Sequence, residues 1–230
     1  MNIYNCSGTL GDTYITLCIL YKIAICEPII CEHYTAQYNW RHLIKQIYSL
    51  LPNIKVQFVN TRSDRGLRIY STFTDHLSYG RIFNNPDNWQ LFPYFNLPYM
   101  SSLPQEYIVL NPIAGRTNQD RQLRTDIIQG TIEQTPYPVI IIGTDDRLKC
   151  INGPGVINLV GKTSLPEAIG IVSKAKKMIT FQGIMSMVSL SHKVPSNIYM
   201  TRKDDEPFVS HRLPDAWKQY CYLIRYKDEL

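Results

Sequence analysis

The N-terminal part of the chain alternates between short apolar runs and longer segments with helical character. Residues 14–24 are mainly apolar over about three turns, which is typical of a buried helix. Residues 40–51 carry apolar side chains at helical spacing and predict a helix with one apolar face. Short strands are expected at residues 2–5, 28–31 and 54–59. This β-α-β-α-β order is the signature of a parallel sheet.

The same alternation restarts beyond residue 104. The uninterrupted apolar run at 138–142 predicts a strand buried in a parallel sheet. Ser164 is a candidate N-cap, followed by Pro166 and Glu167 in the first turn of the next helix. Strands are predicted at residues 107–111, 138–142, 156–160, 177–181 and 195–200, and helices at residues 119–133, 164–173, 184–191 and 214–225.

These two halves predict an α/β protein of two similar, Rossmann-like lobes of minimal size with a C-terminal helix. The stretch between them, residues 72–104, differs because it is rich in Asn, Pro, Phe and Tyr. We therefore expect an N-terminal lobe at residues 1–104 and a C-terminal lobe, with its terminal helix, at residues 105–230. In sheets of this kind, ligands bind at the loops that follow the strands.

Composition narrows the class of protein only moderately. The 230 residues include 24 Lys and Arg against 19 Asp and Glu, so the net charge of +5 permits anionic partners without requiring them. A hydrophobic content of 44% excludes wholesale disorder. No apolar run reaches the roughly 18 residues that a spanning helix needs, so we expect no transmembrane segment.

Signals for targeting, metals and cofactors are absent or misleading. The chain ends in Lys227-Asp228-Glu229-Leu230, which is an ER-retention signal in secreted proteins. The N-terminus does not have the pattern of a signal peptide, because residues 1–6 carry no basic side chain and Asp12 precedes the apolar stretch. We therefore interpret the C-terminal string as coincidental and expect a cytoplasmic protein. The six cysteines form no CxxC pair, and the five histidines form no HxxxH pair. Gly161-Lys162-Thr163-Ser164 lacks the glycine-rich cradle of a phosphate loop. We therefore expect no metal and no cofactor.

Four sequence pieces stand out because each follows a predicted strand. They are Gly11-Asp12, residues 111–116, residues 141–146 with 158–167, and residues 181–187 with Pro195 beyond them. In this order and spacing they resemble the heptosyltransferase-type glycosyltransferases. The resemblance runs from the first strand to about Met200, and residues 159–167 are close to the family string L-x-G-K-T-S-L-x-E. It implies a GT-B fold, in which two Rossmann-like lobes face each other across a cleft.

The resemblance implies that Asp12 is the general base. Inverting sugar transfer needs a carboxylate that takes the proton of the acceptor hydroxyl as that hydroxyl attacks the anomeric carbon. Gly11 and Thr13, on either side of it, are expected on the acceptor side. The alternative is that Asp12 simply caps a helix, since an Asp at a helix start is stabilising by itself.

The resemblance also implies a donor site in the C-terminal lobe. Arg116 or Arg121 would offset the charge of the leaving diphosphate, unless these arginines are merely solvated. Asp145 or Asp146 would bind the ribose of the nucleotide, although an Asp that forms a turn is an equal alternative.

The loop at residues 181–186 matches a family loop, D-S-G-P-x-H, whose backbone N–H groups hold the diphosphate at a helix N-terminus. Gly183 keeps the glycine of that loop, and Met185 and Ser186 follow it toward the donor. Phe181 stands in place of the family's Asp, and Ser186 in place of its His. The resemblance therefore implies backbone contacts to the diphosphate at this loop, without the family's side-chain contacts.

The expected function is an inverting, metal-independent transfer of a sugar from a nucleotide-diphosphate sugar to an acceptor hydroxyl. The acceptor is a glycan, as the resemblance suggests, or a hydroxylated base in DNA. Arg62, Arg65 and Arg68 suit phosphate contacts, and the aromatic middle stretch suits base stacking. The alternative is that these arginines form a surface loop and the aromatic residues belong to the core. A catalytically silent nucleotide-binding or scaffold protein on the same fold is the alternative function.

Overall fold

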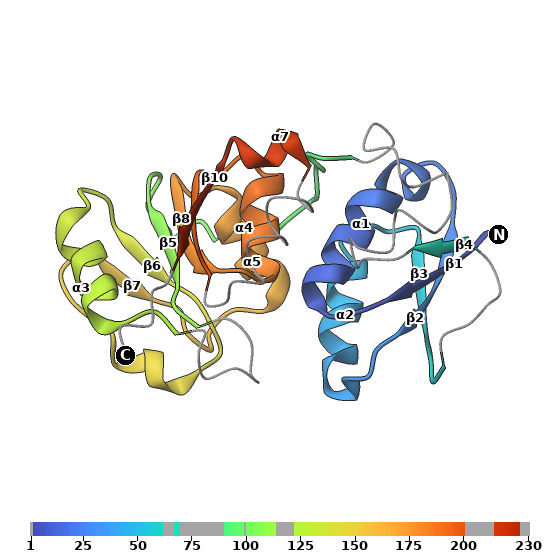
Figure 1. The fold of residues 1–230 in the computed structure, drawn as a ribbon, viewed down its shortest axis with the longest axis horizontal. Coiled ribbons are helices and arrows are strands. Elements are labelled where there is room, and N and C mark those ends of the chain that lie inside the picture. The colour runs from blue at the N-terminus through green and yellow to red at the C-terminus, as the bar shows by residue number, and fades with distance from the viewer. Residues whose placement is uncertain are drawn as a thin grey trace. The chain divides into compact units, whose positions relative to one another are not determined.

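A computed structural model describes residues 2–61, 67–69, 90–98, 100–113, 122–200 and 214–225. The chain divides into two compact units, Met1–Asn96 and Leu97–Leu230 (Figure 1). Both units are α/β structures with parallel sheets, in agreement with the predicted fold class. Within the described residues, no helix has both the length and the apolar character needed to cross a membrane.

The first unit is built on a four-stranded sheet in the order β3-β2-β1-β4. Every neighbouring pair in it is parallel. The strands are β1 (Asn2–Ser7), β2 (Ile29–Tyr34), β3 (Ile54–Val59) and β4 (Leu67–Ile69). The first three agree closely with the strands that the apolar runs predicted.

Two helices, α1 (Leu10–Ala24) and α2 (Arg41–Tyr48), lie side by side along this sheet (Figure 1). A short 3-10 turn, η1 (Tyr38–Trp40), leads into α2. The predicted burial of the first helix is confirmed, because α1 is covered on a second side by residues 90–95. The backbone N–H of Gln90 donates to the Cys18 carbonyl at 3.1 Å, and Phe95 packs edge-on against Tyr14 and Tyr21.

The second unit contains a six-stranded, all-parallel sheet in the order β10-β9-β8-β5-β6-β7. Counted from the first strand of the unit, this is the strand order of a dinucleotide-binding Rossmann fold. The strands are β5 (Ile108–Asn111), β6 (Val139–Ile141), β7 (Val156–Asn158), β8 (Lys177–Phe181), β9 (Ser196–Met200) and β10 (Cys221–Arg225).

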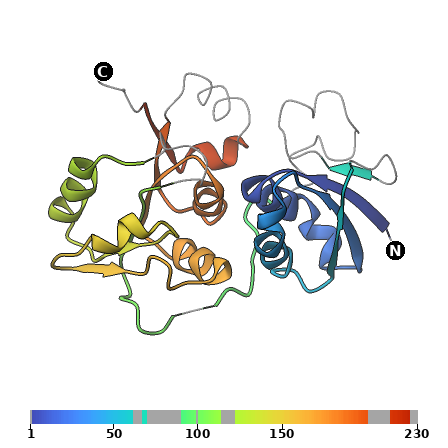
Figure 2. The same ribbon diagram turned by 90° about the horizontal axis from the view of Figure 1, so that it is seen from below.

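Helices cover both faces of this second sheet. Figures 1 and 2 show α3 on one face and α4 with α5 on the other. Leu110, Ile141 and Phe181, each 1% exposed or less, belong to the cluster packed at the centre of the unit. The helices and 3-10 turns are α3 (Thr125–Gln134), η4 (Asp146–Cys150), α4 (Leu165–Ser173), α5 (Ile184–Ser191) and α7 (Asp215–Lys218).

The predicted C-terminal helix at 214–225 is wrong. After Pro214 the chain makes only the short helix α7, which buries Trp217, and then continues as strand β10. β10 pairs with β9 in parallel from Cys221↔Ser196 to Arg225↔Met200. Its Tyr, Leu and Ile residues favour a strand, and the open edge of β9 supplies hydrogen bonds that a marginal helix lacks.

The predicted helix at 119–133 begins too early. α3 starts at Thr125, and the preceding residues run extended beside the end of β5. Ile113 and Gln122 form an antiparallel bridge, and the N–H of Leu123 donates to the Pro112 carbonyl at 2.8 Å. Leu123 is buried as expected, but from an extended segment rather than a helix.

A glycine inside α4 accommodates the chain that enters the second unit. A Cβ built on Gly170 would collide with the carbonyl oxygen of Pro98. Gly130, inside α3, is in open surroundings, because the nearest atom to its Cβ is Gln134 Nε2 at 3.8 Å. The two helical glycines therefore differ in whether a methyl group fits.

We predict opposite effects for the two glycine-to-alanine substitutions. Gly170→Ala should lower the free energy of unfolding by roughly 1–3 kcal/mol, because the Pro98 segment must move. Gly130→Ala should raise it by about 0.5–1 kcal/mol, because alanine is the better helix former. Urea denaturation of the two variants checks this. Equal effects of the same sign would contradict the packing of Pro98 on α4.

Candidate functional site

The strand order of each sheet predicts where a binding or catalytic site would lie. In an open parallel sheet, ligands bind at the carboxyl ends of the strands, where the direction of strand addition reverses. That point lies between β1 and β4 in the first unit and between β5 and β8 in the second. Asp12 follows the carboxyl end of β1, whereas Asn111 and Gly183 lie at or after the ends of β5 and β8.

Asp12 lies in the first turn of α1 rather than in a loop before it. Its Oδ2 accepts the backbone N–H of Thr9 at 2.7 Å and the Thr9 hydroxyl at 2.9 Å. Thr9 and Asp12 thereby form a capping box, which starts the helix four residues earlier than the sequence predicted. The capping role is thus observed in the structure, and it fixes the Asp12 carboxylate at the carboxyl edge of the sheet.

The residues that flank Asp12 differ in exposure. Gly11 and Asp12 are half-buried, whereas Thr13 is fully buried. The Thr13 hydroxyl donates to the Thr9 carbonyl at 2.8 Å. Thr13 therefore stabilises the turn from inside.

Gly8 packs directly against the Asp12 side chain. Its φ of +121° lies in the region that favours glycine, and an added Cβ would lie 2.5 Å from Asp12 Oδ2. Its N–H donates to the Tyr34 carbonyl at the end of β2, at 3.2 Å. The turn between β1 and α1 is therefore attached to the neighbouring strand.

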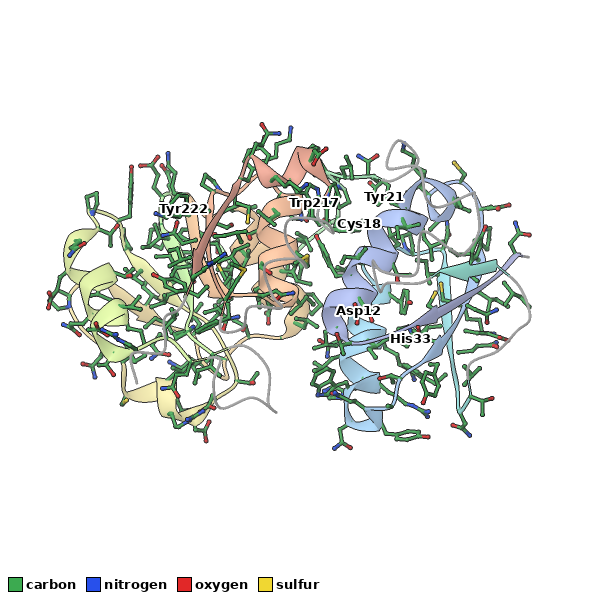
Figure 3. The ribbon with its side chains drawn as sticks, in the orientation of Figure 1. Asp12, Cys18, Tyr21, His33, Trp217 and Tyr222 are labelled. Carbon is green, nitrogen blue, oxygen red and sulfur yellow. The ribbon has the colours of Figure 1, made fainter. Side chains whose placement is uncertain are left out.

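A buried histidine lies on the other side of this turn. His33, on β2, is fully buried, and its Nε2 lies 3.4 Å from the Gly8 carbonyl oxygen. Its Nδ1 lies 3.0 Å from the Tyr48 hydroxyl of α2. Burial lowers the pKa of His33 to about 4, although its contact with the Gly8 carbonyl acts in the opposite direction. Figure 3 labels Asp12 and His33. No role was predicted for His33, because the histidines were considered only for the spacing of metal ligands.

In the second unit, the N-terminus of α5 is the counterpart of the α1 start. Gly183 is the N-cap, and Ser186 Oγ accepts its N–H at 3.0 Å and donates to its carbonyl at 2.7 Å. Met185 and Ser186 are both buried. Phe181, which stands where the family has an Asp, is 1% exposed in the core, so it is not available for contacts with a donor.

Asn111 begins the sequence piece at residues 111–116, although no role was predicted for it. Its side chain is 9% exposed, and its Oδ1 has no hydrogen-bond partner among the described residues. A Cβ on Gly143 would lie 3.8 Å from this oxygen, so the Asn111 amide lies close to the end of β6. An unpaired buried acceptor costs about 1–3 kcal/mol, so a donor from a ligand or water would be stabilising here. The signal in the sequence that could have indicated a role for Asn111 is its position as a polar residue at the end of an apolar strand.

Asp145 and Asp146 are both engaged in ion pairs. Asp145 accepts the backbone N–H of Arg147 at 3.0 Å and two guanidinium bonds at 2.9 and 2.7 Å. Arg147 lowers the pKa of the Asp145 carboxyl to about 2. Asp146 pairs with Lys149 at 2.8 Å. Both aspartates therefore stabilise the turn that opens η4.

The string that carries most of the family resemblance also builds a helix start. Glu167 Oε2 accepts the Ser164 N–H and the Ser164 hydroxyl, each at 2.7 Å, which confirms Ser164 as the N-cap of α4. Lys162 donates to the Asn158 carbonyl at 2.9 Å, and Gly161 has a φ of +72°. The N–H of Gly161 donates to the Gly143 carbonyl at 2.9 Å, so the turns after β6 and β7 are joined at one edge.

The remaining predicted site residues are not brought together by the described part of the chain. Arg62, Arg65, Arg116 and Arg121 lie outside the described residues. Arg68 lies on β4, where its backbone is in register with Asn5 of β1. Among the described residues, no group of three or more His, Cys, Asp or Glu side chains could hold a metal ion.

Comparison with solved structures identifies the fold. No protein-family model and no curated protein matches the sequence. A glycosyl transferase family 9 structure from Veillonella parvula matches with a TM-score of 0.64 and 12% identity, covering 99% of this chain and 87% of that chain. The E. coli heptosyltransferase WaaC, solved with ADP-2-deoxy-2-fluoro heptose, matches with a TM-score of 0.62 and 12% identity, covering 99% and 94%.

A third structure, E. coli ADP-heptose lps heptosyltransferase II, matches with a TM-score of 0.57 and 12% identity, covering 99% of this chain and 91% of that chain. All three likenesses extend over nearly the whole chain. The protein therefore has the fold of these glycosyltransferases.

We predict that Gly8 cannot be replaced without displacing Asp12. Gly8→Ala should lower the free energy of unfolding by roughly 3 kcal/mol or more, because the added methyl group meets the Asp12 side chain and breaks the capping box. Gly155→Ala is the matched control, since Gly155 also has a positive φ of +74° but nothing within 4 Å of its Cβ. It should cost only about 1–2 kcal/mol. Equal losses in denaturant unfolding would show that Asp12 does not rest on Gly8.

We also predict a loss of stability in mild acid. The folded-state pKa of His33, about 4, lies below the ordinary value of 6.5, so the unfolded chain binds this proton first as the pH falls. The free energy of unfolding should be constant with respect to His33 above pH 6.5 and fall by up to about 3 kcal/mol between pH 6.5 and 4. His33→Gln should remove this contribution and leave that of His192, whose pKa burial also lowers to about 4. Denaturation series at pH 7, 6, 5 and 4.5 measure it, and an unchanged slope in the variant would contradict it.

Proposed function

We propose that the protein transfers a sugar from a nucleotide-diphosphate sugar to a hydroxyl group of a glycan, with inversion and without a metal. The observation that carries this proposal is the Asp12 carboxylate, held by Thr9 at the carboxyl edge of the first sheet. The fold shared with enzymes described as ADP-heptose heptosyltransferases supports it and suggests an ADP-sugar as the donor.

In this proposal, Asp12 is the general base. The acceptor oxygen attacks the anomeric carbon, its proton passes to the Asp12 carboxylate, and the bond from that carbon to the diphosphate oxygen breaks. The diphosphate leaves with the electron pair, and attack from the opposite face inverts the anomeric centre. The hydrogen bonds from Thr9 orient the carboxylate before substrate arrives, which reduces the reorganisation needed during reaction.

The donor site is proposed at the carboxyl edge of the second sheet. The N-terminus of α5, at Gly183, offers backbone N–H groups and a partial positive charge to the diphosphate. Met185 and Ser186 shape that helix start from inside, and Arg116 or Arg121 would add positive charge. The buried Asn111 oxygen suits a hydroxyl or amino donor, which fits a nucleoside better than a phosphate.

Asp145 and Asp146 remain proposed ribose contacts. Because Arg147 and Lys149 already pair with them, a ribose hydroxyl would donate to carboxylate oxygens that are held in place. The pairing thus orients the carboxylate oxygens of both aspartates.

The acceptor is proposed to lie on the first unit, near Gly11, Thr13 and the arginines at 62, 65 and 68. A glycan is favoured over a hydroxylated base in DNA. Phe95, one of the aromatic residues that suggested base stacking, is buried against Tyr14 and Tyr21.

One observation favours the second candidate, a catalytically silent nucleotide-binding protein. Phe181 is buried in the core at the position where the resemblance implies an Asp, so this residue offers no polar contact to a donor. Binding of ADP without turnover would be the signature of that function.

We predict that Asp12→Asn abolishes turnover without abolishing donor binding. Asparagine keeps an oxygen that accepts the Thr9 N–H, so the cap survives while the base is lost. Release of ADP from ADP-heptose in the presence of heptose-free lipopolysaccharide should fall by about 100-fold or more. The affinity for ADP, measured by thermal shift, should stay within about threefold.

Glu106→Gln is the matched control for the loss of a carboxylate. Glu106 pairs with Lys176 at the amino end of β5, at 2.7 Å, away from the proposed chemistry, and the variant should turn over normally. Wild-type turnover in Asp12→Asn would overturn the base assignment. Binding of ADP without any turnover in the wild type would instead support the silent protein.

A further inference from the structure

His33 occupies an unusual place for a buried histidine. Its ring lies between β2 and α2, with the Tyr48 ring 5.8 Å and the Phe58 ring 6.1 Å away, both nearly edge-on. Its two nitrogens reach different elements: Nδ1 reaches the Tyr48 hydroxyl and Nε2 reaches the Gly8 carbonyl. The imidazole therefore links a helix to the turn that carries Asp12.

The partners of His33 determine which tautomer is present. A carbonyl oxygen can only accept, so Nε2 must carry the proton that points to Gly8. Nδ1 of the neutral ring is then an acceptor, and the Tyr48 hydroxyl donates to it. Tyr48 thus selects the form of His33 that can hold Gly8.

The groups around His33 keep it neutral. Cys6 of β1 and Phe58 of β3 lie beside it in the sheet register, and Cys31 lies two residues before it on β2. The hydrogen bond with Cys6 and burial raise the pKa of the Cys31 thiol, and burial raises the pKa of the Tyr48 hydroxyl, so both remain uncharged.

Charged groups lie farther from His33. Arg41 and Lys45 of α2 place their cations over the Phe58 ring, at 5.0 and 6.0 Å from its centroid. Asp12 lies beyond Gly8. Burial, rather than any of these charges, is what lowers the pKa of His33.

Gly8 transmits the position of His33 to Asp12. Its N–H donates to the Tyr34 carbonyl and its own carbonyl faces His33, so the peptide units on both sides of Gly8 are attached to the end of β2. The Gly8 carbonyl also shares its peptide plane with the N–H of Thr9. Thr9 follows directly and donates two hydrogen bonds to Asp12. Because Gly8 has a positive φ and contacts the Asp12 side chain, a rotation of this peptide would displace the carboxylate.

We propose that His33 is a positioning residue: held by Tyr48 in its Nε2–H form, it fixes the Gly8 carbonyl and thereby the place of the Asp12 carboxylate. The proposal rests on the proposed role of Asp12 as general base. It adds a second layer to that site, made of groups that never touch the substrate. In this proposal the position of the Asp12 carboxylate also depends on the Tyr48 hydroxyl of α2.

The first arm of the test uses amide hydrogen exchange and needs no activity. The Thr9 amide reports on the turn because it donates to Asp12. In His33→Phe, which keeps a ring but has no donor, Thr9 should exchange about 10-fold faster or more, relative to the Ile29 amide at the other end of β2. In His33→Gln, whose side-chain amide can donate to Gly8, much of the protection should return.

Two further variants complete this arm. Tyr48→Phe removes only a hydroxyl and should give an intermediate rate, and it serves where His33→Phe does not fold. His192→Gln is the matched control, because His192 is a largely buried histidine at the C-terminal end of α5 whose pKa is also lowered, to about 4. It should leave Thr9 unchanged. Unchanged Thr9 exchange in both His33→Phe and Tyr48→Phe would overturn the proposal.

The second arm is a double-mutant cycle with Asp12→Asn, using ADP-heptose and heptose-free lipopolysaccharide. His33→Phe should lower kcat by about 10-fold with an unchanged KM for ADP-heptose, and His33→Gln should restore most of it. In the Asp12→Asn background, His33→Phe should have no further effect, because residues that act through one another are not additive. The same fold-loss in both backgrounds would overturn the positioning role.

The two proposals fail in different ways. Wild-type turnover in Asp12→Asn would overturn the base assignment, and the positioning role with it, whatever the exchange rates. Loss of turnover in Asp12→Asn, with normal kcat in both His33→Phe and Tyr48→Phe, would overturn only the role of His33.

Discussion

Every strand pair in the described sheets is parallel, and this single constraint organises the candidate site. Parallel strands need a crossover after each strand, so all carboxyl ends in a sheet meet at one edge. Asp12, Asn111, Gly143 and Gly183, distant in the sequence, each lie at such an edge as a result. Once the apolar core holds the strands in register, these four residues are positioned at the carboxyl edges of their sheets.

The helix starts at these edges share one local interaction. Asp12, Glu167 and Ser186 each accept the backbone N–H of the N-cap residue three positions earlier, which is Thr9, Ser164 and Gly183 respectively. A family string can therefore reflect helix initiation as well as chemistry. At Asp12 the two roles are compatible, because a cap holds a carboxylate still in the place where a base would be useful.

Sequence patterns predicted some elements to the residue and mistook one edge strand. β8 and α5, both largely buried, match their predicted bounds, and so does β3, an edge strand whose apolar and polar residues alternate. β10 was mistaken for a helix because its residues do not alternate in this way, and its pairing with β9 cannot be read from its own sequence. No role was predicted for His33 or Asn111, because neither the buried contact of His33 with Gly8 nor the unpaired oxygen of Asn111 leaves a spacing pattern in the sequence.

The chain between the two units is attached at both sides of a single residue. Tyr21 donates to the Tyr94 carbonyl at 2.7 Å and packs on Phe95, whereas Leu97 and Pro98 lie against Gly170 of α4. Only the backbone torsions around Asn96 are left between these attachments. Any hinge in residues 94–98 would therefore have to take up its whole rotation at Asn96. Engineered spacers inserted at Asn96 would then lengthen the tether without disturbing either folded half.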